Sequence, residues 1–406
     1  MQFTNRRIVA LWAFPLVLAA LTAAPASAYT FTTLATFTGG TNGATPLGPL
    51  ALNKGTLYGT TSAGAKGYGT VFAIVPGHHL RTLYTFCSQN SCSDGTTPRA
   101  GLILDTSGDL YGTTFGGGAH SSGTVFEVTP SGKESVLYSF CAVVSNDYCA
   151  DGSSPVSTLA RDSAGDLYGT TLNGGANDKG VVFELTYDSA SSSWKEMVLY
   201  SFCAKSNCAD GASPLAGVSI HRGTIYGTAQ LGGANAQGGV FSLDSAGRER
   251  VLYSFCSLEN CADGSEPNAP LIRDSAGTLY GTTKYGGNPN CGDGGGIVFS
   301  LSGTTETVLH KFCSAKADKD GSYPVAGLFE DSGNLYGTAE TGGASSQGVL
   351  FEVMGTTETV LHSFCSATTC GKNPAAGVVV DSAGNIFGTT SAGGRDDDGT
   401  VYELEP

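Results

Sequence analysis

Residues 109–140 read DLYGTTFGGGAHSSGTVFEVTPSGKESVLYSF, and this stretch contains the motif that decides the fold. The tetrapeptide Leu/Ile-Tyr/Phe-Gly-Thr near its start occurs seven times, at intervals of 51 to 58 residues. Its aromatic residue is found at Tyr58, Tyr111, Tyr168, Tyr226, Tyr280, Tyr336 and Phe387. Self-similarity at such a period is typical of repeat architectures, in which each repeat forms one unit of supersecondary structure.

Four apolar segments accompany each tetrapeptide, and in the second repeat they cover residues 98–105, 109–114, 123–128 and 136–140. Each segment is rich in β-branched and aromatic residues and is bounded by Gly, Pro, Asp or Ser, which predicts a short strand. Residues 105–108, Asp-Thr-Ser-Gly, and residues 129–133 have the composition of tight turns between antiparallel strands. Each repeat is therefore expected to form a four-stranded antiparallel sheet.

The period and the two chain ends together predict a closed ring. Four-stranded units of about 50 residues are typical of β-propeller blades. Residues 31–37 match the fourth strand of the repeat, whereas the chain stops at residues 404–406, directly after a third strand. Pairing these ends removes two open sheet edges, which a linear solenoid would not achieve. We expect an all-β, seven-bladed β-propeller of four-stranded antiparallel blades, closed by the N-terminal strand completing the last blade.

The start of the chain has the pattern of an export signal. Two arginines precede an apolar run over residues 8–24, and residues 26–28, Ala-Ser-Ala, form a small-x-small cleavage site. We expect a signal peptide over residues 1–28, cleaved near Ala28, and a single propeller domain over residues 29–406. The expected location is secreted, extracellular or periplasmic. A retained membrane anchor is the alternative, but the apolar run is short and ends in the cleavage pattern.

Composition and charge exclude several classes of protein. The 59 glycines follow no three-residue period, so the chain is not collagen-like, and 19 Phe with 17 Tyr are too many for a disordered chain. The net charge is −14, with 35 acidic against 21 basic residues. Nucleic acids and anionic membranes bind through Lys and Arg that replace counterions, so neither is an expected partner. We expect a monomer.

Most of the twelve cysteines recur at one place in the repeat, the connection from the fourth strand to the next first strand. Ten of them form five close pairs: Cys87/Cys92, Cys141/Cys149, Cys203/Cys208, Cys256/Cys261 and Cys365/Cys370. In an exported protein this spacing predicts local disulfides, and the lack of Cys-x2-Cys spacing disfavours zinc. The remaining two, Cys291 and Cys313, fall in loops on the same face of one blade, so we predict a sixth bridge between them.

Several motifs of the repeat carry a family resemblance. They are Leu110-Tyr111-Gly112-Thr113-Thr114, Gly116-Gly117, Gly123-Thr124-Val125-Phe126-Glu127-Val128, Leu137-Tyr138-Ser139-Phe140, Asp151-Gly152 and Pro155. This set resembles the GloVer repeat of the choice-of-anchor tandem repeat GloVer-containing proteins, over residues 31–406. The resemblance implies a bacterial surface or secreted protein and brings no catalytic residues. Such proteins often end in an anchoring segment, and none is evident here, so a released or periplasmic protein is expected.

Acidic residues of the cysteine-bearing connections are the first candidates for a site. A carboxylate precedes a glycine in five of these connections, at Asp94, Asp151, Asp210, Asp263 and Asp320. One interpretation is turn capping, in which each carboxylate accepts hydrogen bonds from backbone N–H groups. The other is a ring of carboxylates that binds Ca²⁺ or a cationic ligand. No closely spaced calcium-loop ligands are evident, so no resident cofactor or metal is expected, and Ca²⁺ stays open.

A second candidate is the charged run Arg395, Asp396, Asp397 and Asp398, in the last loop between a second and a third strand. It is interpreted as a solvated loop or as a binding site. Tyr68, Tyr148, Tyr285 and Tyr323 fall near the same face and are candidates for stacking on sugars.

The residues favour a binding or scaffold protein that recognises a protein or glycan through its disulfide-bearing face, because propellers present variable loops over a rigid scaffold. The alternative is a polysaccharide lyase or glycosidase that uses acidic residues on that face. No catalytic residue is assigned, since no nucleophile–base motif or phosphate-binding loop is evident in the sequence.

Overall fold

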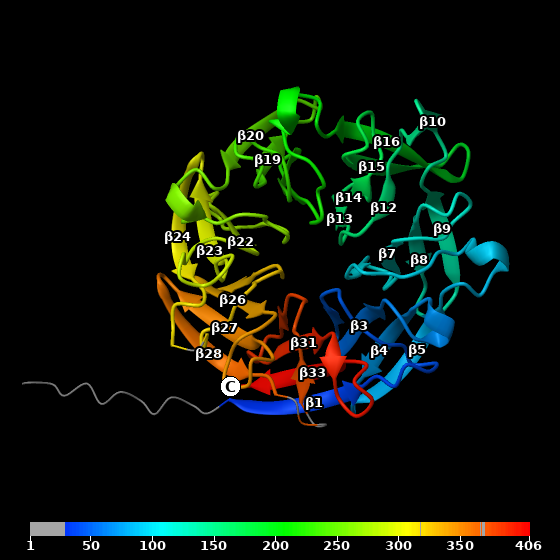
Figure 1. Ribbon diagram of the computed structural model, residues 1–406. Helices are drawn as coiled ribbons and strands as arrows, with labels where there is room; N and C mark the ends of the chain where they lie inside the picture. Colours follow the sequence, from blue (N-terminus) through cyan, green and yellow to red (C-terminus); the bar gives the residue numbers. More distant parts are fainter. Residues whose placement is uncertain (1–28, 317, 366, 368–369) are drawn as a thin grey trace, which may run out of the picture.

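The computed structural model describes residues 29–316, 318–365, 367 and 370–406, and it forms a ring of seven four-stranded antiparallel sheets (Figure 1). The predicted signal peptide lies outside the described residues. Blades 1 to 3 consist of β2 Ala51–Asn53, β3 Thr56–Thr61, β4 Thr70–Val75 and β5 His79–Thr85; β6 Ile103–Leu104, β7 Leu110–Thr114, β8 Thr124–Val128 and β9 Glu134–Ser139; and β13 Ala160–Arg161, β14 Leu167–Asn173, β15 Val181–Asp188 and β16 Ser193–Ser201.

The remaining blades repeat this order. Blades 4 to 6 consist of β17 Ser219–His221, β18 Thr224–Ala229, β19 Gly239–Leu243 and β20 Glu249–Ser254; β21 Ile272–Arg273, β22 Leu279–Thr283, β23 Ile297–Ser302 and β24 Thr305–Lys311; and β25 Phe329–Asp331, β26 Asn334–Ala339, β27 Val349–Met354 and β28 Thr357–Ser363. Blade 7 consists of β30 Val379–Val380, β31 Ile386–Thr390, β33 Thr400–Glu405 and β1 Thr30–Thr36.

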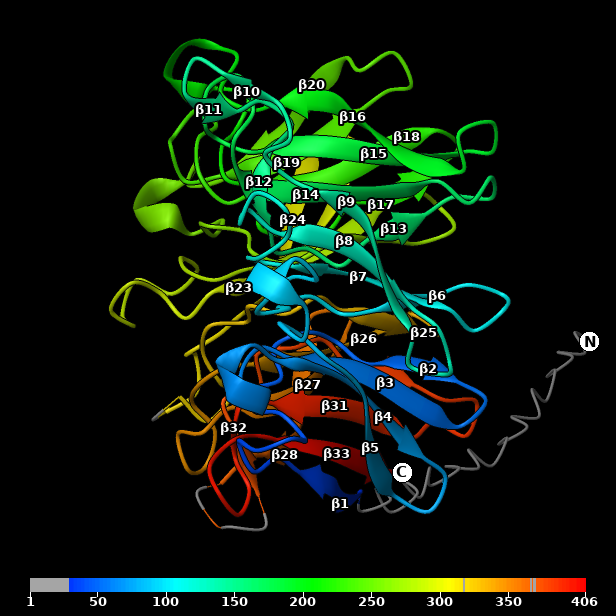
Figure 2. The same ribbon diagram turned by 90° about the vertical axis from the view of Figure 1, so that its right-hand side faces the viewer.

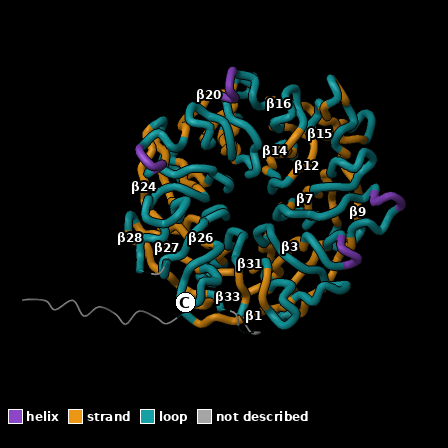
Figure 3. Tube along the Cα trace, viewed as in Figure 1, coloured by secondary structure: helices purple, strands orange, loops and turns teal. Residues whose placement is uncertain are grey.

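The loops contain a few further short elements. They are β10 Val144–Ser145, β11 Tyr148–Cys149, β12 Ser153–Pro155, β29 Gly371–Lys372 and β32 Ala392–Gly393, with the 3₁₀ helices η1 Ala65–Gly67, η2 Asn90–Cys92, η3 Ser206–Cys208 and η4 Glu259–Cys261. The 3₁₀ helices lie at the outer rim of the ring (Figure 3). Among the described residues, no helix is long and apolar enough to span a membrane.

The ring closes as predicted. β1 pairs antiparallel with β33, in a register that runs from Thr30 opposite Glu405 to Thr36 opposite Thr400. The first and last strands of the chain therefore share blade 7, where the blue and red ends of the ribbon lie side by side (Figure 1). This pairing leaves neither terminal strand as an open edge at the join.

The repeated tetrapeptide holds neighbouring blades together. A Phe directly after each fourth strand packs against an aromatic ring on the next blade's third strand, and the seven pairs have centroid distances of 4.9 to 5.1 Å. The glycine of the tetrapeptide makes room for this ring, because a Cβ atom on Gly112 would lie 2.7 Å from Phe126. The threonine that follows bonds across the junction: the Thr113 hydroxyl donates to the carbonyl of Ser157, 3.2 Å away.

The innermost strands are shorter than predicted. The sequence predicts a strand over residues 98–105, but β6 contains only Ile103 and Leu104. Thr97, before the proline, has a φ of +56°, and equivalent residues in the other six blades are also left-handed. Such a residue breaks the extended backbone, so the Pro-x-Ala-Gly segment runs along the central channel instead of joining the sheet. Because all seven blades share this conformation, it belongs to the fold and not to one site.

Candidate functional site

Six disulfides mark one face of the ring, which we call the disulfide face. The structure forms the same six pairs that the sequence predicts: Cys87–Cys92, Cys141–Cys149, Cys203–Cys208, Cys256–Cys261, Cys291–Cys313 and Cys365–Cys370. In side view, η2 and the β10–β11 hairpin project on this face, at the left (Figure 2). The opposite face carries the tight turns between first and second strands and between third and fourth strands, and we call it the hairpin face.

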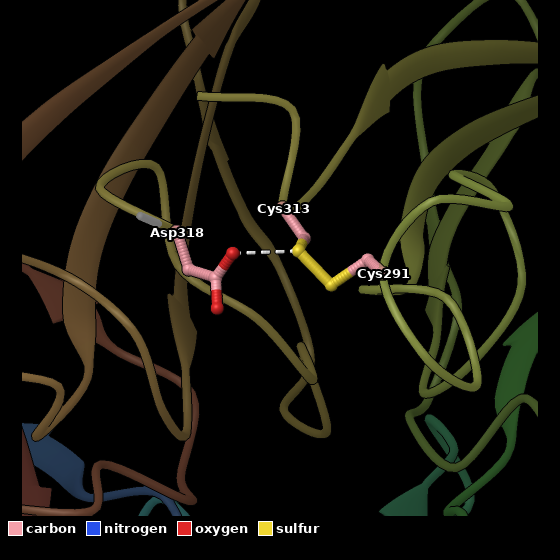
Figure 4. Close-up of side chains that lie close together, drawn as sticks. All are labelled: Cys291, Cys313 and Asp318. Atoms are coloured by element: carbon pink, nitrogen blue, oxygen red, sulfur yellow. Dashed lines mark hydrogen bonds between the residues drawn. A yellow bond between two sulfur atoms is a disulfide. The ribbon is translucent and has the colours of Figure 1, made fainter. Parts of the chain in front are cut away.

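The Cys291–Cys313 bridge differs from the other five because it joins two separate loops (Figure 4). Its Cα atoms are 6.1 Å apart, and the Asp318 carboxylate lies 2.7 Å from the sulfur of Cys313. Among the described residues, these three side chains form the one group with enough nearby ligand atoms to suggest a metal site. Both sulfur atoms are bonded to each other and cannot act as thiolate ligands, so the group provides no cation site in the oxidised protein.

The five aspartates that precede glycines cap their own loops. Asp94 is fully buried, and its carboxylate accepts hydrogen bonds from the backbone N–H groups of Ser88 and Gln89, at 2.9 and 3.4 Å. The others make equivalent bonds: Asp151 to Ala142 and Val143, Asp210 to Ala204 and Lys205, Asp263 to Ser257 and Leu258, and Asp320 to Ser314 and Ala315. Their geometry supports turn capping. This is the first of the two interpretations of the sequence. The cation-binding ring gains no support from the structure, because these oxygens are buried and already hydrogen-bonded.

Each capping aspartate also takes part in a buried acidic cluster between blades. The Tyr138 hydroxyl donates a 2.7 Å hydrogen bond to Asp151, and Glu196 from the next blade lies close to both. The same arrangement occurs in three other junctions, around Glu134, Glu249 and Glu306, and around Glu358 with His310 in place of the tyrosine. One carboxylate oxygen of each of these five glutamates is buried without a hydrogen-bond partner among the described residues.

Burial changes the acidity of these glutamates. Burial, reinforced by the negative charge of Asp151, raises the pKa of Glu196 to about 8. The same two causes raise the pKa of Glu134 and Glu306 to about 7. Their recurrence at the start of the fourth strand is visible in the sequence, but the sequence analysis did not single it out. Because these carboxylates lie between blades, their protonation affects the stability of the ring.

Blade 7 is joined to its neighbours without such a cluster. At the junction with blade 6, Phe31 stacks on His362 with a centroid distance of 3.9 Å, and burial lowers the pKa of His362 to about 4. At the junction with blade 1, Ala35 and Leu80 occupy the tyrosine and glutamate positions and pack against one apolar cluster. The blade that closes the ring is thus held by apolar contacts at the positions where the others use buried carboxylates.

Only some residues of the acidic loop at residues 395–398 form hydrogen bonds or ion pairs with the other described residues of the ring. Asp397 forms an ion pair with Lys372, with an N–O distance of 2.8 Å, and accepts a 2.7 Å hydrogen bond from the backbone of Gly393. These bonds lower the pKa of the Asp397 carboxyl. Arg395 and Asp396 are exposed, and Asp398 is half-buried with its backbone oxygen bonded to Thr45. The structure does not bring these four side chains together with another candidate site residue.

The central channel is narrow at the level of the Pro-x-Ala-Gly segments. A cavity of about 200 Å³ lies there, lined mainly by the small and apolar side chains of these segments, including Leu47, Val156, Leu215 and Val325. Arg99 and Asn268 also line it. Such walls leave few polar groups with which to orient a ligand inside the channel.

Variable residues surround the mouth of this channel on the disulfide face. In six blades the left-handed residue before the proline accepts a backbone hydrogen bond from the residue just after the second strand, as Glu266 does from Lys284 at 3.1 Å. In blade 3 the equivalent residues, Ser154 and Leu172, lie within the pairing of β12 with β14. Seven such pairs form a ring: Thr45/Ser62, Thr97/Phe115, Ser154/Leu172, Ser213/Gln230, Glu266/Lys284, Tyr323/Glu340 and Asn373/Ser391. We call this set the mouth ring. At these positions the seven repeats carry different side chains on one backbone geometry.

Charged and aromatic residues of the mouth ring are concentrated in blades 4 to 6, which we call the polar sector. The Gln230 amide donates a 3.1 Å hydrogen bond to Glu266, and the Lys284 ammonium lies 5.1 Å from the centroid of the Tyr285 ring. Tyr285 in turn packs edge-to-face against Tyr323 of the next blade, with centroids 5.5 Å apart. All of these side chains are half-buried. These contacts link side chains of blades 4 to 6, and Tyr285, next to Lys284 in the chain, is counted with the polar sector.

The opposite part of the mouth ring offers fewer polar groups. Arg99 stacks over Phe115 at 4.1 Å, which uses the face of that ring. The hydroxyls of Ser62 and Ser391 each donate a 2.9 Å hydrogen bond to the backbone oxygen of the paired residue. The polar sector therefore differs from the rest of the mouth ring in its charged side chains and its pair of tyrosines, which also contact one another.

A family model described as the Gloeobacter/Verrucomicrobia repeat matches three stretches that together span nearly all of the chain, residues 20–149, 142–319 and 293–406. The chain belongs to this family. The match confirms the resemblance carried by the tetrapeptide and the strand motifs. None of the curated proteins compared with this member of the Gloeobacter/Verrucomicrobia repeat family matches it significantly.

Solved structures share the general architecture of this Gloeobacter/Verrucomicrobia repeat protein. They include a putative gluconolactonase at 12% identity and a TM-score of 0.40, covering 94% of this chain and 93% of that one. A PL25 ulvan lyase bound to -[GlcA(1-4)Rha3S]- has 11% identity and a TM-score of 0.49, with coverage of 90% and 94%. Trypanosoma rangeli sialidase with the inhibitor DANA has 10% identity and a TM-score of 0.44, with coverage of 88% and 54%. At these values the likenesses carry no functional argument.

Proposed function

We propose that this protein is an exported, non-enzymatic binding protein that recognises a glycan at the polar sector of the mouth ring. Export is supported by the signal-like pattern of residues 1–28 and by six disulfides, which persist in oxidising compartments. The main support for this binding site is the concentration of amide, ammonium, carboxylate and tyrosine groups in three adjacent blades of an otherwise regular ring.

The chemistry of the polar sector suits a sugar. Sugars expose C–H faces that pack on aromatic side chains and hydroxyls that bond to planar polar groups. The sector supplies Tyr285 and Tyr323 for the first interaction, and Gln230, Glu266 and Lys284 for the second. A tyrosine contributes a large contact area with little loss of conformational entropy, which favours its use as an anchor at a binding surface. The ammonium of Lys284 would favour a sugar that carries a carboxylate or sulfate.

Affinity electrophoresis in gels that contain soluble polysaccharides tests this proposal. The panel includes neutral glucan and xylan and acidic alginate and polygalacturonate. We expect retardation by at least one acidic polysaccharide and a loss of at least about 10-fold in affinity for Tyr323→Ala. Asn373→Ala is the matched control, because it changes the same left-handed, pre-proline position in blade 7. Equal retardation of the two variants would refute the assignment of the site.

Polysaccharide cleavage is the second candidate function, since Glu266 and Glu340 lie on either side of Lys284 in the mouth ring. A lyase needs a base to remove a proton and a cation to neutralise the adjacent carboxylate. Incubation with the retained polysaccharide separates the two functions. Binding without new reducing ends or unsaturated products supports the binding protein, whereas product formation that is abolished by Lys284→Ala supports the enzyme.

A further inference from the structure

A cavity of about 570 Å³ opens on the hairpin face between blades 7 and 1, far from the mouth ring. Its floor is apolar and includes Leu34, Leu57 and Phe387. Its polar wall contains the carboxylates of Asp381 and Glu403. The cavity is therefore amphipathic, with a size that suits a small organic molecule.

Glu403 is unusual among the equivalent glutamates. In blades 2, 3 and 6 the tyrosine of the repeated tetrapeptide donates its hydroxyl to a third-strand glutamate: Tyr111 bonds to Glu127, Tyr168 to Glu184, and Tyr336 to Glu352 at 2.9 Å. Blade 7 has Phe387 at the tyrosine position, so this donor is missing. No described residue forms a hydrogen bond or ion pair with the Glu403 side chain, although that residue is only 8% exposed.

The other charged groups of the cavity already accept hydrogen bonds within the protein or lie exposed at the rim. Asp381 caps its turn, where it accepts hydrogen bonds of 2.8 and 2.9 Å from the backbone of Ala383 and Asn385. Lys54 and His78 are exposed at the rim, where water screens their charge. Burial and the charges of Glu405 and Asp381 raise the pKa of Glu403, and the nearby His78 offsets part of this rise. An unpartnered carboxyl facing an apolar cavity is costly unless a ligand supplies the missing donor.

We propose that this cavity binds a small primary amine with an apolar body, with the ammonium group hydrogen-bonded to Glu403 and the apolar part packed on Phe387. The ammonium replaces the hydroxyl donor that a tyrosine supplies in blades 2, 3 and 6. The neighbouring grooves do not offer the same site. At the junction of blades 6 and 7 Tyr336 bonds to the equivalent glutamate, and Tyr29 lies close to both.

Calorimetric titration with phenethylamine tests the proposal, with 2-phenylethanol as the uncharged analogue. We expect saturable binding of the amine with a Kd of about 1 mM or tighter, in the range open to a ligand of this size, and at least about 10-fold weaker binding of the alcohol. Glu403→Gln should lower the affinity for the amine to that of the alcohol. Phe387→Tyr restores the side chain found in the other six blades, so it should fold and weaken amine binding at least about 10-fold.

The matched control is Glu352→Gln, which changes the equivalent glutamate in blade 6 and should leave the affinity unchanged. Thermal unfolding of each variant shows that the ring is intact. Absence of saturable amine binding, equal binding of amine and alcohol, or equal affinity of Glu403→Gln and Glu352→Gln would each overturn the proposal. None of these results bears on glycan binding at the mouth ring, because the two sites lie on opposite faces.

Discussion

The buried glutamates between blades predict that this protein becomes less stable as the pH rises from about 5 to 8. Glu196 has a pKa of about 8 in the folded ring, whereas the ordinary value is about 4.5. Between these pH values the folded chain retains a proton that the unfolded chain releases. The free energy of unfolding therefore falls with pH, by at most about 1.4 kcal/mol per pH unit for each such group. Glu134 and Glu306, with pKa values of about 7, add to this slope.

Glu196→Gln isolates the contribution of one cluster. The full pKa difference corresponds to a limit of about 4 to 5 kcal/mol, and partial exposure of the half-buried side chain reduces this to about 2 kcal/mol. We expect the variant to match the wild type within about 0.5 kcal/mol at pH 5 and to exceed its stability by about 2 kcal/mol at pH 8. The gain arises because glutamine cannot acquire the charge that the junction with Asp151 disfavours.

Chemical denaturation at pH 5, 6, 7 and 8 measures this difference directly. Glu259→Gln is the control, since Glu259 is exposed on η4 and should leave the pH dependence unchanged. A Glu196→Gln variant whose stability falls with pH as steeply as that of the wild type, or one that is less stable at pH 8, would refute the reasoning.

Three further predictions concern the ring itself. Replacing both Cys291 and Cys313 by serine should lower the free energy of unfolding by about 3 kcal/mol, as judged by chemical denaturation, because the bridge spans 22 residues. Gly112→Ala should lower the free energy of unfolding by about 1 to 3 kcal/mol in the same assay, because the new Cβ atom would overlap Phe126. Gly40→Ala is the control and should lower it by less than about 1 kcal/mol, because the nearest atom to its Cβ would be 3.7 Å away. Deleting residues 29–37 removes β1 and should produce oligomers or aggregates in size-exclusion chromatography, because β33 becomes an open edge; a monomer with an unchanged melting temperature would contradict this.

The blade structure was predictable because it depends on local patterns. The spacing of the tetrapeptide determined the number of blades, and the fourth-strand motif at residues 31–37 predicted the closure by β1. The Cys291–Cys313 pairing was predictable from the strand connections alone. These features require the positions of residues within one repeat and the order of repeats, both of which the sequence contains.

The contacts between blades were not predictable in the same way. Glu196 and Asp151 are 45 residues apart, so their proximity depends on how the blades and their connections pack. The sequence suggested that Asp151 caps a turn or binds a cation, and it gave no sign of a nearby glutamate. Tyr285 and Tyr323 were placed near the disulfide face, but their contact across two blades depends on the loop geometry around the channel. The polar sector could not be predicted, because its residues come from different repeats and are brought together only in the folded mouth ring.

The crystal structure of the protein with an oligosaccharide from a retained polysaccharide tests the proposed binding site most directly. We predict a sugar in the polar sector on the disulfide face. It should contact Tyr285 and Tyr323, and one of its polar groups should bond to the Lys284 ammonium. An oligosaccharide bound elsewhere on the ring, with Tyr285, Tyr323 and Lys284 free of contact, would contradict the account.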